Sequence, residues 1–334
     1  MCYLYVSENG STINMEAGYF VVKNKEELVT KIPKETLESI GLFGNIHLTT
    51  PCVRECLKRK IPICYFSNNG YYFGKLEPPR NTNIFRLKKQ IHMTEDVEFT
   101  LGFAKKIIDA KIHNQVVLMK RYNRTVKAEL VDEEKAMKAA QTRVSGCKSI
   151  DQVMGYEGIA SKNYFQGLAK LVVPDFAFEG RNRMPPRDPF NAMISFGYTV
   201  LMEEIYGELE NHGLTPFGGF MHQDRERHPT LASDLLEEWR AVIVDAVVLS
   251  MIQGHEISLC DFTREEENGG VILKKEAKRK FLGKLENKMQ SEMNYLSYIS
   301  SKSSFRKAIW LQIGELVKAV EAENFNLYEP IRIR

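Results

Sequence analysis

The chain has 334 residues, of which 43% are hydrophobic and 27% are charged, and its net charge at pH 7 is only +3. This composition is ordinary for a globular protein, and the length is sufficient for two domains. The small net charge excludes a surface that is basic throughout, so a nucleic-acid contact would have to be a local patch. No apolar run approaches the length of a membrane span. The six cysteines form no CxxC pair and no zinc-finger spacing, so we expect a protein of the reducing cytoplasm.

The first 77 residues are predicted to be rich in β-strands. CYLYV alternates in polarity, YFVVK and NIHLTT are β-branched or aromatic, and Asn9-Gly10 is a tight-turn signal. Further along, PICYFS and YYFGKLE flank Asn68-Asn69-Gly70, which predicts a hairpin with a short loop. Thr50 and Pro51 are typical of the start of a short helix between these strands.

The hydrophobic period changes across KLEPPRNTN, residues 75–83, which has the Pro, Arg and Asn content of a linker. From Ile84 onward the period is helical, as in RLKKQIHMTEDVEFTLGFAKKIIDAKIHNQVVLMKRYNR. We therefore predict an α+β fold, with a small N-terminal β-rich domain (residues 1–78) and a larger all-α domain (residues 79–334).

A helix predicted to begin after Ser149 carries an acidic residue on its apolar face. Ser149 and Gln152 match a capping box, and apolar residues recur at i, i+3 and i+4 in SIDQVMGYEGIASKNYFQGLAKLV. Glu157 lies within this apolar stripe. Gly155 and Gly158 flank it and cost the helix up to about 1 kcal/mol each relative to Ala, which suggests that something approaches the backbone closely there.

The position of Glu157 leaves two interpretations open. A carboxylate that faces a core needs a cation, a charged partner or several hydrogen-bond donors. Glu157 is therefore either an oxygen ligand of a metal ion or the partner of an arginine such as Arg143 or Arg181.

The stretch from Gly218 to Arg240 reads GGFMHQDRERHPTLASDLLEEWR and combines a Gly-rich approach, a histidine and the start of a helix predicted over residues 230–252. Asp234 and Glu237 project from one face of that helix, about 60° apart. With His222 they form a candidate site for a divalent cation. The alternatives are a structural imidazole at His222 and an Asp234 that only favours the helix N-terminus.

Two segments are candidates for contact with phosphates. The loop PDFAFEGRNRMPPRDPF, residues 174–190, contains Arg181, Arg183 and Arg187, and guanidinium groups bind phosphate in a bidentate manner. The basic run KKEAKRKFLGKLENK, residues 274–288, is more typical of a solvated helix face than of a DNA site.

Several of these segments, taken in order and spacing, carry a family resemblance. They are KIHNQ (111–115), GYEGIASKNYF (155–165), GRNRMPPRDPFNAMISFGYTVL (180–201), GGFMH (218–222), SDLLEEWR (233–240), DF with GGVIL (261–273), and the terminal YEPIRIR. With them the chain resembles the CRISPR-associated adaptation endonuclease, the larger and catalytic subunit of the CRISPR spacer integrase. The resemblance covers nearly the whole length and implies a β domain joined to a helical catalytic domain.

The resemblance also implies a mechanism and a set of site residues. In that family a glutamate, a histidine and a second acidic residue bind the catalytic metal, and these positions fall on Glu157, His222 and Glu237, with Asp234 beside them. The cofactor is expected to be Mg²⁺ or Mn²⁺, and the mixed oxygen and nitrogen ligands suit Mn²⁺ somewhat better. The expected reaction is attack of the 3′-hydroxyl of a short DNA duplex on the CRISPR repeat, or cleavage when water attacks instead.

The expected partners are double-stranded DNA, a second copy of the chain, and a dimer of the small ferredoxin-like CRISPR adaptation subunit. Arg181, Arg183, Arg187 and Arg240 are the expected DNA contacts. We expect the β domain to form much of the homodimer interface, with one metal site per subunit and the two sites far apart. Two alternative functions are a stand-alone structure-specific nuclease for branched DNA and a non-catalytic DNA-binding scaffold.

Overall fold

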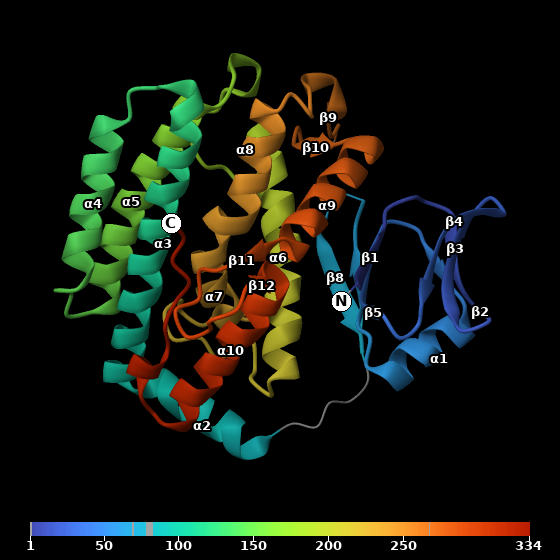
Figure 1. Cartoon of the computed structure of the whole chain (residues 1–334), viewed down its shortest axis with the longest axis horizontal. Helices are drawn as coiled ribbons and strands as arrows, with labels where there is room; N and C mark the ends of the chain where they lie inside the picture. The colour runs from blue at the N-terminus through green and yellow to red at the C-terminus, as the bar shows by residue number, and fades with distance from the viewer. Residues whose placement is uncertain (1, 69, 78–82, 267) are drawn as a thin grey trace. The chain divides into compact units, whose positions relative to one another are not determined.

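The computed structural model describes residues 2–68, 70–77, 83–266 and 268–334 (Figure 1). Contacts among them separate two compact units, Met1–Arg80 with Ile272–Glu286 and Asn81–Val271 with Asn287–Arg334. The predicted boundary between residues 78 and 79 lies outside the described residues. The division of labour between two domains therefore stays a prediction.

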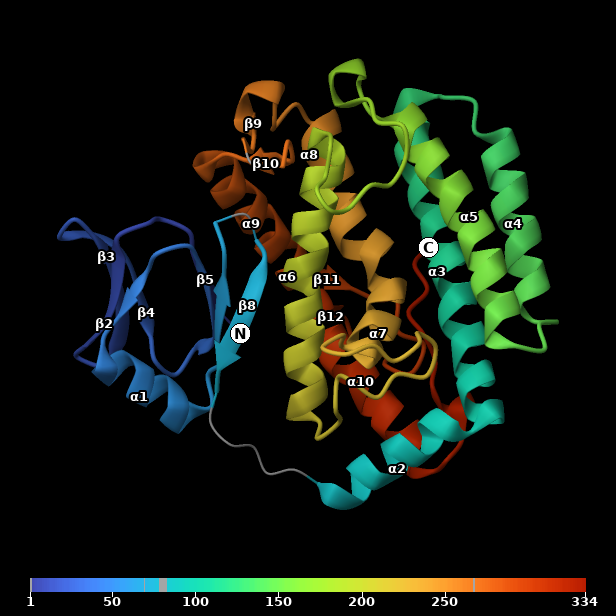
Figure 2. The same cartoon turned by 180° about the vertical axis from the view of Figure 1, so that it is seen from behind.

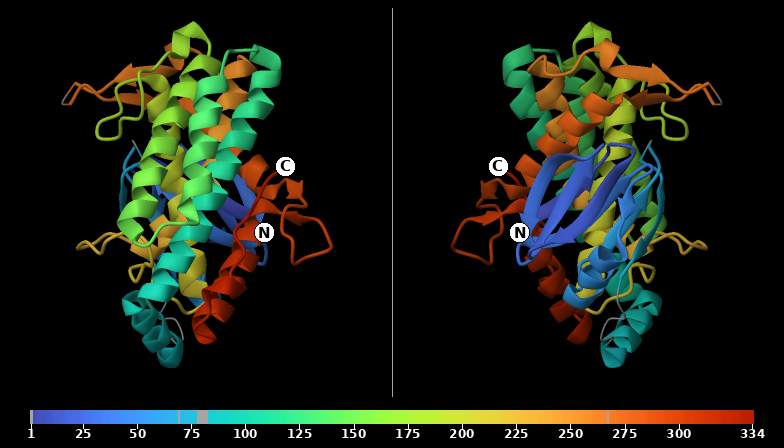
Figure 3. Two further views of the ribbon diagram at one scale, coloured as in Figure 1. Left: turned by 90° about the vertical axis from the view of Figure 1, so that its left-hand side faces the viewer. Right: turned by 90° about the vertical axis from the view of Figure 1, so that its right-hand side faces the viewer.

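The first unit contains two four-stranded sheets and the helix α1 (Thr50–Arg59) (Figure 3). One sheet has the order β1-β5-β7-β8, formed by β1 (Cys2–Val6), β5 (Leu37–Phe43), β7 (Ile63–Phe66) and β8 (Tyr72–Leu76). The other has the order β4-β3-β2-β6, formed by β4 (Glu27–Pro33), β3 (Tyr19–Asn24), β2 (Ser11–Glu16) and β6 (His47–Leu48).

The alternating residues of these strands explain the core of the first unit. Ile13, Phe20 and Ile40 are completely buried, and α1 contributes Cys52 and Cys56 to the same cluster. β7 and β8 pair antiparallel, which is the hairpin predicted from the sequence, although Asn69 in its loop lies outside the described residues.

The second unit is mostly helical (Figures 1 and 2). Its helices are α2 (Ile84–Glu95), α3 (Val97–Val126), α4 (Val131–Val144), α5 (Ile150–Leu171), α6 (Pro189–Asn211), α7 (Thr230–Arg240), α8 (Ala246–Gln253) and α10 (Phe305–Glu321). The helix α9 (Lys275–Gln290) belongs to the first unit up to Glu286 and to the second beyond it. The predicted α+β class is confirmed.

Short strands and single helical turns add detail that the hydrophobic pattern did not predict. The strands are β9 (Phe262–Arg264) with β10 (Val271–Leu273), and β11 (Glu292–Met293) with β12 (Ser303–Ser304). The turns are η1 (Pro174–Phe176), η3 (Leu259–Asp261) and η4 (Phe325–Leu327). Strands of two or three residues are too short to show a period of two.

The long helix α3 is the element on which the site depends, because it packs against both α5 and α7. Asp96 caps its start by accepting a hydrogen bond from the Phe99 amide at 2.8 Å. Most of its buried residues are apolar, yet Lys111, Asn114 and Gln115 are also buried in its middle. Buried polar side chains need partners, so these residues mark where the neighbouring helices must supply them.

The helix predicted over residues 230–252 is interrupted. α7 ends at Arg240, a π-helical turn η2 (Ala241–Asp245) follows, and α8 continues from Ala246. A π turn inserts an extra residue and shifts the faces of the helix beyond it, and such turns occur often at functional sites. Among the described residues, no helix has both the length and the apolar character needed to cross a bilayer.

Candidate active site

Three helices of the second unit bring two glutamates to one ammonium group. Lys111 of α3 forms ion pairs with Glu157 of α5 and with Glu237 of α7, the latter with Nζ 2.6 Å from Oε2. Glu157 Oε1 also accepts a hydrogen bond of 2.6 Å from the Ser161 hydroxyl, one turn along α5. The two carboxylates, which are 80 positions apart in the sequence, therefore converge on one point.

The charges at this point stabilise one another. Burial favours the neutral form of Glu237, but Arg240, Lys111 and His222 outweigh it and lower its pKa to about 2. Burial raises the pKa of Glu157, but the charge of Lys111 outweighs this effect and the pKa lies below its ordinary value. For Lys111, burial favours the neutral amine, and the two carboxylates more than compensate and raise its pKa. All three groups are charged near neutral pH.

Asp234 holds the Gly-rich loop against the start of α7. The residue is completely buried, and its two oxygens accept hydrogen bonds from the backbone amides of Phe220, Met221 and His222 at 2.7, 3.0 and 3.0 Å. Gly219 is required for this approach, because a Cβ there would lie 2.8 Å from Thr230 and 2.9 Å from Asp234 Oδ2. Asp234 therefore fixes the backbone that carries His222.

Asp234 also orients the imidazole of His222. His222 Nδ1 lies 2.6 Å from Asp234 Oδ1, and Nε2 lies 3.9 Å from Glu237 Oε1. Burial lowers the pKa of His222, but the hydrogen bond and charge of Asp234 reverse this and raise it. A histidine that donates one ring N–H to a buried carboxylate presents its other nitrogen in a fixed direction, which here is toward Glu237.

Arg240 extends the site toward α6. Its guanidinium lies 2.7 Å from Glu237 Oε1 and 5.0 Å from the centre of the Tyr198 ring. The guanidinium of Arg181 lies 5.6 Å from the centre of the same Tyr198 ring. Tyr198 is held in place because its hydroxyl donates a hydrogen bond of 2.6 Å to Asp245.

The predicted site residues occupy three kinds of position. Glu157 and Glu237 both contact Lys111, and His222 Nε2 lies 3.9 Å from Glu237 Oε1, whereas Asp234 lies behind His222 and contacts the loop. Arg181 and Arg240 have partners inside the protein: Arg181 donates to Asn182 O, to Asn191 Oδ1 and to Ser195 Oγ. Arg183 and Arg187 are exposed.

The alternative in which Glu157 pairs with Arg143 or Arg181 is not what the structure shows, because its partners are Lys111 and Ser161. Lys111 was missed as a site residue by the sequence reasoning. The signal was present, since Lys111 opens the KIHNQ segment that helped to carry the family resemblance. Nothing in the spacing of that segment reveals which of its residues faces Glu157.

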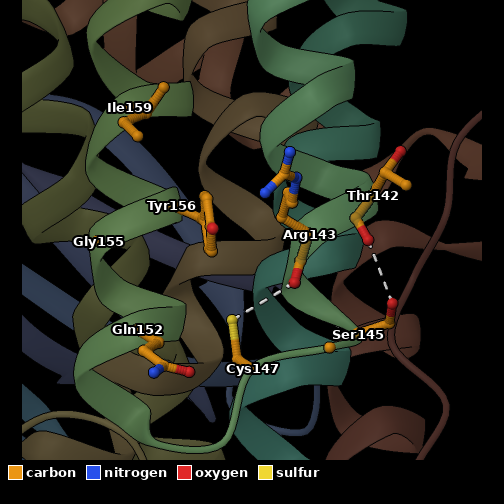
Figure 4. A pocket seen from close by; sticks show the side chains of 9 residues that line it. Thr142, Arg143, Ser145, Cys147, Gln152, Gly155, Tyr156 and Ile159 are labelled. Carbon is orange, nitrogen blue, oxygen red and sulfur yellow. Dashed lines mark hydrogen bonds between the residues drawn. The ribbon is translucent and has the colours of Figure 1, made fainter.

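The open space around the two glycines of α5 differs from the expectation of close packing. Apart from the adjacent residues and the backbone of the same helix turn, no described atom lies within 4 Å of a Cβ built on Gly155 or Gly158. A cavity of about 600 Å³ does lie beside Gly155, between the end of α4 and the first half of α5 (Figure 4). Gln152, Gly155, Tyr156 and Ile159 line it on α5, on the side of the helix away from Glu157. This cavity is separate from the site.

Glu238, the residue after Glu237, is the centre of a second buried cluster. Its carboxyl accepts hydrogen bonds from the Tyr328 hydroxyl and, at 2.8 Å, from the Ile331 amide. Asn114 of α3 donates to the backbone carbonyls of Glu238 and Ile331 at 3.1 and 2.9 Å. Burial raises the pKa of Glu238 to about 8, although the hydrogen bonds from Tyr328 and Ile331 oppose this shift. The cluster attaches the C-terminal segment to α7 and α3.

Two comparisons by sequence agree with each other. Residues 4–287 match the family model described as CRISPR associated protein Cas1. The CRISPR-associated endonuclease Cas1 of Mycobacterium tuberculosis is 37% identical over 322 residues, which cover 96% of this chain and 95% of the relative.

Solved structures of other proteins share the fold described above. A casposase bound to its integration product has a TM-score of 0.85 at 24% identity, with 100% of this chain and 96% of that chain covered. A chain of a Cas6-RT-Cas1–Cas2 complex has a TM-score of 0.82 at 25% identity and covers 98% of this chain. This chain spans 36% of that longer chain.

The family model and the curated relative, together with the fold, define an endonuclease and integrase of CRISPR adaptation. This confirms the predicted function and enzyme class. The chain belongs to the Cas1 family of CRISPR-associated proteins, which confirms the predicted family as well.

Proposed function

We propose that the enzyme holds a divalent cation, Mg²⁺ or Mn²⁺, with Glu157, His222 and Glu237, and uses it to join the 3′-hydroxyl of a short DNA duplex to the CRISPR repeat. The observation that carries the proposal is the convergence of Glu157 and Glu237 on one ammonium, with His222 Nε2 3.9 Å from Glu237. A point that the buried Glu237 and the partly buried Glu157 share accommodates positive charge.

The chemistry of the donors supports a metal site. Among the described residues, no three His, Cys, Asp or Glu side chains already enclose a point at ligand distance, and Lys111 neutralises the glutamates instead. Yet two carboxylates and one imidazole suit Mn²⁺ or Mg²⁺. Asp234 on the far nitrogen of His222 is the usual support of a metal-binding histidine. The residues present therefore fit the group.

Each residue then has a definite task. When bound, the cation would polarise the scissile phosphate and stabilise charge on the attacking and leaving oxygens. Glu157, Glu237 and neutral His222 would bind it through their side-chain oxygens and Nε2. Asp234, whose oxygens already accept four hydrogen bonds, would position His222. Lys111 and Arg240 would balance the negative charge of the carboxylates and of an approaching phosphate.

We assign the DNA contacts among the predicted arginines by exposure. Arg183 and Arg187 are exposed and free to reach phosphates of the duplex. Arg181 and Arg240 remain in the proposed DNA surface, but their guanidiniums also contact Tyr198, so they would act close to the reacting phosphate. Arg183→Gln and Arg187→Gln are each expected to weaken DNA binding and to reduce the slope of log affinity against log salt concentration by about one.

The proposal includes assembly. The Cas1-like chain of the Cas6-RT-Cas1–Cas2 complex supports a partnership with the small ferredoxin-like adaptation subunit. The exposed large apolar side chains of the first unit support a homodimer. The six free thiols are consistent with the cytoplasm. Measuring the mass of the full chain in solution, with and without the small subunit, tests this part.

The decisive experiment supplies short duplexes with 3′-hydroxyl ends and a plasmid that bears a CRISPR repeat, with Mg²⁺ or Mn²⁺, with and without the small subunit. Strand-transfer products that require both metal and repeat are expected. His222→Ala should abolish strand transfer and cleavage while DNA affinity is retained, because phosphate binding depends on arginine and lysine.

His228→Ala is the matched control, since His228 lies near the same helix start and contacts Ser233 at 3.2 Å. It should remain active. Cleavage of branched DNA without any strand transfer would instead favour a stand-alone nuclease. Loss of DNA binding by His222→Ala equal to its loss of activity would contradict the assigned roles.

A further inference from the structure

We propose that Gln115 receives the ammonium of Lys111 when a divalent cation enters the site, so that the lysine moves aside and stays hydrogen-bonded. Gln115 ends the KIHNQ segment of α3, which Lys111 opens. The inference rests on the proposed function and deepens it. It states how a site that is filled by its own lysine becomes free to bind metal.

Four of the five residues of KIHNQ have contacts that explain them. Lys111 pairs with the two glutamates of the site, and Ile112 is completely buried. His113 and Asn114 bind the C-terminal segment. Gln115 is only 4% exposed, yet among the described residues its Oε1 has no hydrogen-bond partner. Gln115 is therefore the residue of this segment that still lacks a role.

An unpaired amide oxygen in the interior is costly. A carbonyl that is removed from water and gains no donor destabilises the folded state. Every residue of α3 is described, and within this helix Gln115 Oε1 is the one buried side-chain oxygen or nitrogen without a hydrogen bond. Such an acceptor has a purpose if a donor reaches it in another state of the protein.

Lys111 is the donor that the helix geometry brings to Gln115. The two residues are four positions apart, so their side chains share one face of α3. Long side chains of a helix lean toward its N-terminus, and the side chain of Gln115 therefore covers the turn that carries Lys111. Lys111 is itself only 5% exposed. A change of rotamer moves its ammonium from the carboxylates to Gln115 while the backbone stays in place.

The charges of the site make this move necessary. Lys111 Nζ lies 2.6 Å from Glu237 Oε2 and also pairs with Glu157, so it occupies the point that the two carboxylates share. A divalent cation bound by both carboxylates would repel an ammonium at that distance. A buried ammonium that lost both partners and gained no acceptor would be strongly disfavoured. Gln115 Oε1 removes this penalty and keeps a positive charge beside the place where a DNA phosphate arrives.

The test measures Mn²⁺ binding without DNA to wild type, Gln115→Met, Lys111→Met and the double variant. Methionine keeps an unbranched side chain at both positions and removes the amide acceptor or the charge. The electron paramagnetic resonance signal of free Mn²⁺ is lost on binding, so a titration gives the affinity and needs no catalysis.

The effect of Gln115→Met should depend on Lys111. In the wild-type background it should weaken Mn²⁺ binding about tenfold, because the displaced ammonium then has no acceptor. In the Lys111→Met background the same change should alter the affinity by less than about twofold, since there is no ammonium to receive.

A second readout, the melting temperature without metal, needs no change at Lys111 and holds even if Lys111→Met does not fold. Gln115→Met removes an unpaired buried amide and should raise this temperature while it weakens Mn²⁺ binding. Gln312→Met is the matched control. Gln312 is completely buried as well, but it accepts a hydrogen bond of 2.8 Å from Tyr298 and donates one of 2.6 Å to the Glu329 carbonyl. Its loss should lower the melting temperature and leave Mn²⁺ affinity nearly unchanged.

The possible outcomes separate this inference from the proposed function. An equal loss of Mn²⁺ affinity in both backgrounds, an unchanged affinity of Gln115→Met, or a lower metal-free melting temperature for that variant would overturn the role of Gln115 alone. If neither wild type nor Lys111→Met binds Mn²⁺, the proposed function fails and this inference fails with it. The expected affinities without any strand transfer would count against the proposed function only.

Discussion

Glu237 and Glu238 are consecutive residues of α7, both buried, and their environments are opposite. The pKa of Glu237 is lowered to about 2, whereas that of Glu238 is raised to about 8. Burial favours the neutral form in both cases. The difference comes from the partners, since Glu237 faces Lys111 and Arg240 and Glu238 faces the neutral hydroxyl and amide of Tyr328 and Ile331.

This contrast shows how one turn of helix serves two purposes. Glu237 keeps its negative charge and is suited to bind a cation. Glu238 is protonated over most of the physiological range and acts as a hydrogen-bonding anchor for the C-terminal segment. The anchor also fixes the direction of α7, because Asn114 of α3 binds the backbone of Glu238. The same helix contact therefore aligns Glu237 with Lys111, three residues before Asn114.

The largest effect should separate the two glutamates by function. Glu237→Gln removes a charged ligand and is expected to slow strand transfer at least about 100-fold. Glu238→Gln replaces a carboxyl that is neutral at pH 7 by a neutral amide of similar shape, so activity should be nearly retained. The measurement is the rate of strand transfer at pH 7 for both variants. Equal losses would show that the two residues do not differ as described.

Removing the ammonium between the two carboxylates should give the next largest effect. Lys111→Met leaves the buried Glu237 and the partly buried Glu157 without their shared partner, and the free energy of unfolding should fall by about 3–5 kcal/mol. Mn²⁺ should raise the melting temperature of this variant more than that of wild type, since a ligand stabilises the state that binds it.

Lys120→Met serves as the control for this change. Lys120 lies on the surface of the same helix, α3, and pairs with Glu134 of α4 at 3.2 Å. Surface pairs contribute only about 0–1 kcal/mol. If Mn²⁺ stabilises neither wild type nor Lys111→Met, the two glutamates are not the metal ligands.

A smaller loss should follow from breaking the anchor. Asn114→Ala leaves the carbonyls of Glu238 and Ile331 and the amide of Ile333 without their side-chain partner. The free energy of unfolding should fall by about 2–3 kcal/mol. Chemical denaturation measures it, with Asn163→Ala as control because Asn163 donates an exposed hydrogen bond of 2.8 Å to the Ile159 carbonyl of its own helix. A loss equal to that of the control would mean that the C-terminal segment needs no such anchor.

The smallest expected effect extends the comparison to a basic residue. Lys288 lies over the Phe305 ring at 4.2 Å, and burial, helped by nearby Arg121, lowers its pKa to about 8. Since its pKa is lower in the folded than in the unfolded chain, folding is penalised below pH 8 and the penalty disappears as the pH rises toward the unfolded value of about 10.4.

Lys288→Met should therefore stabilise the protein by about 0.5–1 kcal/mol at pH 7. The advantage should shrink between pH 8 and 10. Melting temperatures of both proteins across that range provide the check. A constant difference at all pH values would show that packing, and not the charge, is responsible.

Much of this protein is determined by local properties of its sequence. The change of period near Ile84 predicts a β-rich part and a helical part, because alternation and helical spacing are properties of neighbouring residues. The segments around Glu157, His222 and Glu237 likewise identify the family and nominate those three residues, because each needs a partner wherever the chain places it.

The tertiary structure decided which partners those residues have. Lys111 lies 46 positions before Glu157 and 126 before Glu237, and no helical period relates positions that far apart. Asp234 was a candidate at the metal because it shares a helix face with Glu237, yet its oxygens hold the 220–222 backbone. The opposite pKa values of Glu237 and Glu238 have the same origin, since the charge state of a buried carboxyl depends on groups that only the packed helices bring to it.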